Sequence, residues 1–83
     1  MKELTLYGRP GCHLCEDMRA ALEDCQTRLG FTLREIDIDS DPALAARYGT
    51  LIPVLEDTAG EICHYFLDPA ALNKALAMSP GNG

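Results

Sequence analysis

Residues 4–15 read LTLYGRPGCHLC, and this stretch decides the fold class of the chain. An apolar run that ends at Gly8 is typical of a first strand, and the Pro and Gly residues that follow are typical of a loop. From Leu14 onward the apolar residues recur with helical spacing, at positions 14, 18, 21, 22, 25 and 29. Gly30 is well suited to end that helix. The stretch therefore predicts a strand that leads through a short loop into a helix, with two cysteines at the junction.

A second strand is predicted over residues 31–39, where apolar and polar positions alternate with one slip of phase between Leu33 and Ile36. An Asp-Pro pair at 41–42 then predicts a helix that ends at residue 48, because Asp is a good helix cap and Pro fits the first helical turn. The chain thus begins with a β-α-β unit, whose two strands should lie parallel.

The remaining elements follow from the same signals. Two further strands and a last helix are predicted, at residues 51–55, 62–66 and 70–78. A tight turn between the two strands makes them antiparallel neighbours. The order β-α-β-α-β-β-α predicts a four-stranded mixed sheet with helices on both faces, in a single domain of residues 1–78. The polar residues 79–83 are expected to form a flexible tail.

Composition narrows the range of functions. The chain has 83 residues, room for one modest core. Its 13 acidic and 7 basic residues give a net charge of −6, which argues against nucleic-acid binding because phosphate backbones require a basic face. The sequence shows no secretory leader and no apolar run long enough to cross a bilayer. We therefore expect a cytoplasmic protein with no membrane partner, and nothing in the sequence requires more than a monomer.

The four cysteines are unevenly distributed. Cys12 and Cys15 are three residues apart, Cys25 lies on the apolar stripe of the first helix, and Cys63 lies in a predicted strand. A secreted scaffold spreads its cysteines so that they staple loops, whereas a close pair in a cytosolic chain indicates redox or metal chemistry. Cys25 and Cys63 are expected to be packing residues.

The position of the pair at a helix start assigns a role to each sulfur. Residues three apart in a first helical turn are close enough for a disulfide. Cys12 faces the unpaired N–H groups and the positive end of the helix dipole, and Arg9 and His13 can add positive charge there, so its thiolate should be stabilised. We therefore predict that Cys12 is the attacking nucleophile and that Cys15 resolves the mixed disulfide.

Residues 7–15 (YGRPGCHLC) resemble the active-site segment of glutaredoxins, which carry a Tyr, a basic residue three positions before the first cysteine, and C-x-x-C. Leu51-Ile52-Pro53 is similar to the Thr-Val-Pro segment of that family, whose proline is cis and packs beside the cysteines. The resemblance implies a thioredoxin-like fold and thiol–disulfide oxidoreductase activity. It also implies that the backbone groups of Ile52, next to Pro53, stay free to pair with an incoming peptide or with glutathione.

Two departures from the family pattern bear on the substrate. Glutaredoxins usually follow the fourth strand with Gly-Gly and acidic residues that hold glutathione, whereas this chain has Tyr65-Phe66-Leu67-Asp68. Asp68 still offers a carboxylate or free N–H groups at a helix start. The dipeptide between the cysteines is His-Leu instead of Pro-Tyr, which indicates a divergent glutaredoxin-like branch. We expect no bound cofactor, glutathione as a possible reductant, and a disulfide-containing protein or glutathione as partner.

Two other functions are compatible with the sequence. The first is a metal or iron–sulfur module in which Cys12 and Cys15 supply two of the four ligands that a structural site needs. Cys63, His64 or a second chain would have to supply the others. The second is a non-catalytic binding domain that uses the groove around Pro53 while the cysteines remain idle.

Overall fold

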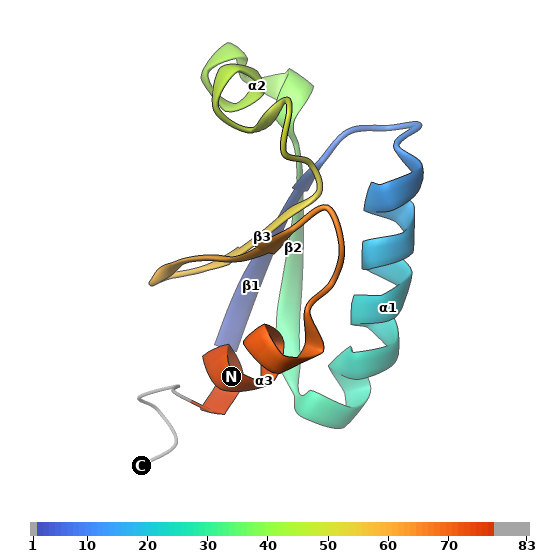
Figure 1. Ribbon diagram of the computed structural model, residues 1–83, viewed down its shortest axis with the longest axis vertical. Coiled ribbons are helices and arrows are strands. Elements are labelled where there is room, and N and C mark those ends of the chain that lie inside the picture. Colours follow the sequence, from blue (N-terminus) through green and yellow to red (C-terminus); the bar gives the residue numbers. More distant parts are fainter. Residues whose placement is uncertain (1, 78–83) are drawn as a thin grey trace.

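The computed structural model describes residues 2–77 and arranges them around one β-sheet (Figure 1). The elements are, in chain order, β1 (Lys2–Gly8), α1 (His13–Leu29), β2 (Phe31–Asp37), η1 (Ile38–Ser40), α2 (Pro42–Tyr48), β3 (Val54–Asp57), β4 (Gly60–His64) and α3 (Pro69–Ala77). The predicted order of elements is confirmed, with the short 3₁₀ turn η1 added. The tail predicted at residues 79–83 and the predicted helix end at residue 78 lie outside the described residues.

The sheet has four strands in the order β2-β1-β3-β4. β1 runs parallel to β2 and antiparallel to β3, and β3 runs antiparallel to β4. Gly8, the last residue of β1, lies opposite Asp37 at the end of β2, and its neighbour Tyr7 lies opposite Val54 at the start of β3. The segments that follow β1 and β2 and the segment that precedes β3 therefore meet at one end of the sheet.

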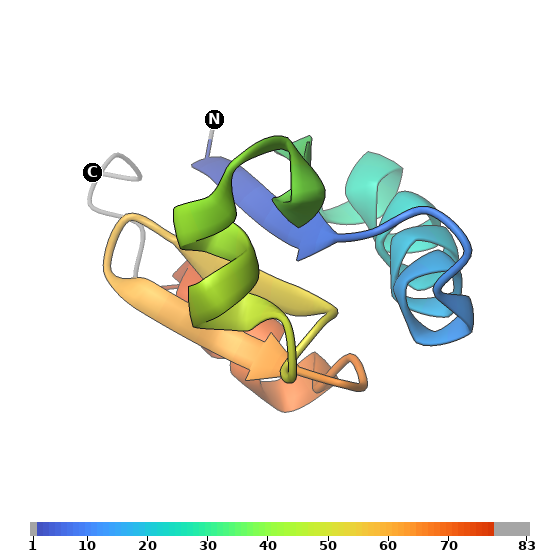
Figure 2. The same ribbon diagram turned by 90° about the horizontal axis from the view of Figure 1, so that it is seen from above.

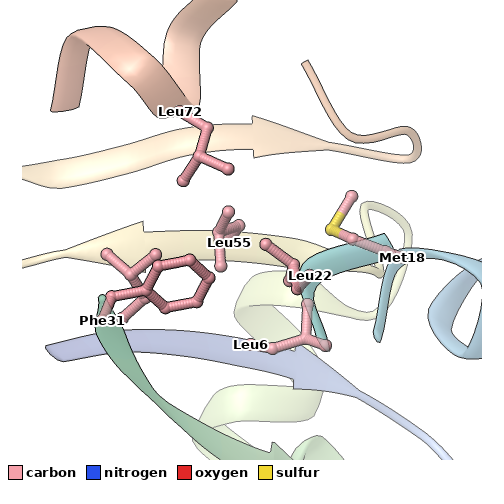
Figure 3. Close-up of a cluster of buried hydrophobic side chains, with 7 residues drawn as sticks. Leu6, Met18, Leu22, Phe31, Leu55 and Leu72 are labelled. Carbon is pink, nitrogen blue, oxygen red and sulfur yellow. The ribbon is translucent and has the colours of Figure 1, made fainter. Parts of the chain in front are cut away.

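Apolar side chains fill both faces of the sheet because successive residues of a strand point to opposite sides. On one face, α1 and α3 close a cluster made of Leu4, Leu6, Met18, Leu22, Phe31, Leu55 and Leu72 (Figure 3). On the other face, α2 helps to close a smaller cluster of Ile38, Tyr48 and Val54. Figure 2 looks down on α2, with α1 to one side of the strands. The predicted mixed sheet with helices on both faces is confirmed.

Tyr48 fastens α2 to the sheet. Its ring stacks on Tyr7 with a centroid separation of 4.3 Å, and its hydroxyl donates a hydrogen bond of 2.6 Å to the carboxylate of Glu56. Burial, reinforced by that hydrogen bond, raises the pKa of the Tyr48 hydroxyl. The loop between α2 and β3 is thereby held at the same sheet end as the cysteines. No helix among residues 2–77 is long and apolar enough to span a membrane.

The end of β2 differs from the prediction. The strand stops at Asp37 instead of residue 39, and Ile38 is buried within the 3₁₀ turn. The Asp37 side chain accepts a hydrogen bond of 2.9 Å from the N–H of Asp39, and the Ser40 hydroxyl donates to the carbonyl of Asp37 over 2.6 Å. Such local side-chain bonds compete with strand pairing and turn the chain away from the sheet.

The last two strands also start and end elsewhere than predicted. β3 begins at Val54 instead of Leu51, because the N–H groups of Leu51 and Ile52 both donate to the carbonyl of Tyr48 in the turn that ends α2. β4 covers Gly60–His64 instead of residues 62–66. Tyr65 ends it with a φ of 64°, a left-handed conformation that a strand does not contain.

Candidate functional site

Cys12 and Cys15 form a disulfide at the N-terminus of α1, with their Cα atoms 5.2 Å apart. Cys12 is the N-cap residue, with an extended backbone (φ −90°, ψ 112°), and its sulfur accepts a hydrogen bond of 3.2 Å from the N–H of Cys15. An N-cap side chain normally satisfies one of the free N–H groups of the first helical turn, and here a sulfur takes that place. The same N–H is positioned to stabilise a Cys12 thiolate once the pair is reduced.

The two sulfurs differ in their access to solvent. Cys15 is only 8 % exposed, whereas Cys12 is half-buried. Cys15 packs against the end of β1, where a Cβ atom on Gly8 would lie 3.0 Å from the Cys15 sulfur. The absence of a side chain at Gly8 therefore makes room for the inner cysteine. An incoming disulfide reaches Cys12 more readily than Cys15.

Arg9 points its guanidinium at Asp39, an acid that sequence reasoning missed. Two hydrogen bonds of 3.0 Å join the guanidinium to the two carboxylate oxygens. The hydrogen bond and the charge of Asp39 raise the pKa of Arg9, and the hydrogen bond from Arg9 lowers the pKa of the Asp39 carboxyl. The signal was present in the β-α-β order: parallel strands end at the same sheet edge, so residues that follow them meet.

Arg9 nevertheless lies close to the cysteine pair. Its carbonyl accepts a hydrogen bond of 3.3 Å from the N–H of Cys12, and Arg9 and Cys15 line one cavity of about 300 Å³ together with Glu35 and Asp37. The positive charge of Arg9, predicted to stabilise the Cys12 thiolate, is thus partly neutralised by Asp39. His13, the other residue predicted to stabilise the thiolate, is the exposed first residue of α1.

Because Arg9 and Asp39 carry opposite charges, their replacement should shift the titration midpoint of the Cys12 thiol in opposite directions. With the other three cysteines replaced by serine, Asp39→Asn should free the Arg9 charge and lower the midpoint of the Cys12 thiolate titration by about 0.5 pH units, and Arg9→Met should raise it by a similar amount. The measurement is the ultraviolet absorbance of the thiolate as a function of pH. Equal midpoints in all three proteins would remove Arg9 from the chemistry, and shifts in the same direction would indicate a change of loop structure instead.

Pro53 lies at the same end of the sheet as the cysteines. It is fully buried, it directly precedes Val54, which pairs with Tyr7, and its peptide bond with Ile52 is cis. The expectation that both backbone groups of Ile52 are free is wrong for the N–H, which donates to the carbonyl of Tyr48 over 3.1 Å. The turn after α2 captures this group, so an incoming chain has to displace it or pair elsewhere.

Asp68 is used by the protein itself. Its carboxylate accepts hydrogen bonds of 3.1 and 3.2 Å from the N–H groups of Ala70 and Ala71, so it caps α3. In the preceding strand, burial raises the pKa of the Cys63 thiol, and the backbone of Asp68 acts in the opposite direction. The carboxylate and the N–H groups that the sequence suggested for ligand binding at this helix start are therefore already paired with one another.

The other candidate ligands lie apart from the disulfide. Cys25 and Cys63 are half-buried and pack against the core cluster under α1 and α3, as predicted. His64 is exposed, and its Nδ1 lies 2.6 Å from the carboxylate of Glu61. Within residues 2–77 the structure brings together no group of three or more His, Cys, Asp or Glu side chains that would hold a metal ion.

Comparisons with known proteins agree with this geometry. The model of a family described as "Glutaredoxin-like domain (DUF836)" matches residues 3–77. Protein Ne2328 from Nitrosomonas europaea is similar in structure with a TM-score of 0.81, at 41 % sequence identity over 89 % of each chain. Protein XcR50 from X. campestris gives a TM-score of 0.72 at 39 % identity, over 93 % of this chain and 99 % of its own. Thioredoxin 1 from Thermosipho africanus, at 15 % identity, gives 0.62 over 93 % and 97 % of the two chains, a likeness of fold.

Proposed function

The chain belongs to the glutaredoxin-like domain family and has a thioredoxin-like fold, and from this premise we propose that it is a thiol–disulfide oxidoreductase. The observation that carries the proposal is the Cys12–Cys15 disulfide at the N-terminus of α1, where an N–H group contacts the outer sulfur. A disulfide that joins residues of one helical turn opens and closes with little movement of the backbone. Both sulfurs come from one chain, so a monomer suffices.

The proposed cycle begins with the reduced pair. The Cys12 thiolate attacks one sulfur of a substrate disulfide, the substrate S–S bond breaks, and the first substrate thiolate leaves and takes a proton from solvent. The Cys15 thiol then loses its proton and attacks the Cys12 sulfur of the mixed disulfide. The Cys12–Cys15 bond forms, the bond between Cys12 and the substrate sulfur breaks, and the second substrate thiolate leaves and takes up the proton that Cys15 gave up. The substrate gains two electrons from the protein. An external thiol such as glutathione then reduces the Cys12–Cys15 disulfide again, and two of these thiols are oxidised to a disulfide.

The positions of the two sulfurs support Cys12 as the nucleophile and Cys15 as the resolving thiol. Cys12 is the more exposed and receives the N–H of Cys15, which favours its thiolate form. Cys15 lies inside, against Gly8, where it is shielded from a substrate disulfide but is within bonding reach of the Cys12 sulfur. We place the protein in the cytoplasm, where the glutathione and thioredoxin systems keep thiols reduced and can regenerate the pair.

A coupled assay tests the proposal. The wild-type protein is incubated with hydroxyethyl disulfide and either glutathione with its reductase or a thioredoxin-type reductase, and the oxidation of NADPH is followed. We expect turnover above the rate without protein in at least one of the two systems. The donor that works then identifies the reductant. Absence of turnover in both, and no disulfide loss when the reduced protein is mixed with the substrate directly, would contradict the proposal.

A further inference from the structure

Two large aromatic side chains, Tyr65 and Phe66, are exposed to solvent. Tyr65 is 39 % exposed and Phe66 is 67 % exposed, and the other large apolar residues among residues 2–77 are buried or half-buried. They are consecutive in the connection between β4 and α3. Single exposed apolar residues are common, but an adjacent pair of aromatic residues in one patch is typical of an interaction site.

The connection holds these residues in a fixed conformation. The N–H of Tyr65 donates to the carbonyl of Pro53 over 2.9 Å, and the Tyr65 hydroxyl donates to the carbonyl of Thr50 over 2.8 Å. The N–H of Phe66 donates to the carbonyl of His64 over 2.7 Å. The aromatic pair is therefore attached to the loop that carries the cis-proline. A surface that is ordered before binding loses less entropy when a partner arrives.

A groove of about 260 Å³ separates these residues from α1. Leu14, Met18 and Ala21 of α1 form one wall together with Asp17, and residues 65–67 form the other. Leu14, at one end of the α1 wall, directly precedes Cys15, and the opposite wall is hydrogen-bonded through Tyr65 to Pro53, at the same end of the sheet as the cysteines.

The charge at the groove is negative. Glu16 and Asp17 follow Cys15 directly and both are exposed, and Asp17 lines the groove. None of the described lining residues is a lysine or an arginine. The whole chain carries a net charge of −6. Surfaces of one sign attract partners of the other, and this attraction acts on the rate of association.

We propose that Tyr65, Phe66 and the groove beside α1 form a docking surface for a disulfide-bearing protein segment. The segment carries a large apolar residue and a basic residue next to its disulfide. This inference rests on the proposed function and names its substrate class. Oxidised glutathione fits the surface poorly because it is anionic and has no large apolar side chain. The acidic side chain at the start of α3, Asp68, is moreover occupied as a helix cap.

Two capped peptide disulfides test the docking surface. The probes are the homodisulfides of N-acetylated, C-amidated Arg-Phe-Cys and Glu-Ser-Cys, each mixed with the reduced wild-type protein under single-turnover conditions. One peptide disulfide is reduced to two peptide thiols as the Cys12–Cys15 disulfide forms, so no further reductant is needed. Each rate is divided by the rate of the same protein with hydroxyethyl disulfide. We expect the Arg-Phe-Cys disulfide to react at least about tenfold faster, the discrimination that one apolar contact provides.

Variants assign this preference to the groove. Phe66→Ala should reduce the rate advantage of the Arg-Phe-Cys disulfide over the Glu-Ser-Cys disulfide to about threefold or less. Asp17→Asn should reduce this rate advantage in part and make it less sensitive to salt concentration. Asp24→Asn is the matched control, because Asp24 is an exposed acid of α1 two turns farther from the cysteines and does not line the groove. Equal rates for the two peptides, or a preference that survives both groove substitutions, would overturn the docking surface.

A binding experiment separates this inference from the proposed function. The Cys12→Ser variant is titrated with a capped Arg-Phe-Ser peptide, and amide chemical shifts are followed by NMR. Shifts centred on Met18, Tyr65 and Phe66 are expected, and their absence would refute the surface even if the redox assay succeeds. If the protein reduces no disulfide but these shifts appear, the redox proposal fails and the docking surface stands.

Discussion

Replacing Cys12 with serine is expected to reduce turnover with hydroxyethyl disulfide by at least about 1000-fold, because a serine hydroxyl is not ionised at neutral pH and forms no mixed disulfide. Cys12 is the outer sulfur of the pair and the N-cap of α1, and a serine preserves the cap. The loss should therefore come without a change of fold. It is measured as the initial rate in the coupled assay, with the circular dichroism spectrum as the check on structure.

The matched control is Cys25→Ser. Cys25 lies on the same helix and is half-buried, but it packs against the core and is not part of the disulfide. Its variant should keep the wild-type rate within about twofold at a temperature where it is folded. Retention of more than a tenth of the activity by Cys12→Ser, or an equal loss in both variants, would exclude Cys12 as the nucleophile.

The second large effect concerns stability, at Leu55. This side chain is fully buried in β3, between Leu22 of α1 and Leu72 of α3 in the cluster of Figure 3. Leu55→Ala should lower the free energy of unfolding by about 2–5 kcal/mol, because it removes buried methyl groups and leaves a cavity that the sheet cannot close. The total stability of a small domain is only about 5–15 kcal/mol, so the melting temperature should fall by about 10 °C or more.

Denaturant unfolding of the oxidised proteins measures this change. Phe66→Ala serves as the contrast, since it removes a larger side chain from an exposed position and should alter the free energy of unfolding by no more than about 0.5 kcal/mol. A loss below about 1 kcal/mol for Leu55→Ala would contradict the packing described for the core.

Local patterns were sufficient to predict the order of the elements. The helical spacing of Leu14, Met18 and Leu22 is the buried stripe of α1, and the Asp-Pro pair at residue 41 does start α2 with a capping bond from Ala43 to Asp41. The boundaries were less predictable. The end of β2 depends on side-chain bonds of Asp37, and the late start of β3 depends on two N–H groups that both reach Tyr48. Neither choice has a periodic signal.

The site was predictable where it depends on neighbours in sequence. The Cys12–Cys15 pairing follows from their spacing at a helix start. Asp39 and Gly8 could not be recognised so directly. The pairing of Asp39 with Arg9 depends on the register between β1 and β2, and the contact of Gly8 with Cys15 depends on how α1 packs against β1. Tyr65 stood out in the sequence as a departure from a family pattern. That its hydroxyl reaches Thr50, fifteen residues earlier, is a property of the folded chain.

Cys12 is tested most directly as the nucleophile by the intact mass of the Cys15→Ser variant after the reduced protein is mixed with hydroxyethyl disulfide. Without the resolving sulfur, the cycle should stop at the mixed disulfide. We expect one mercaptoethanol adduct, and peptide mapping should place it on Cys12, with Cys25 and Cys63 free. An adduct on Cys25 or Cys63 instead, or no adduct while the wild type is active, would contradict the assignment of Cys12 as the nucleophile.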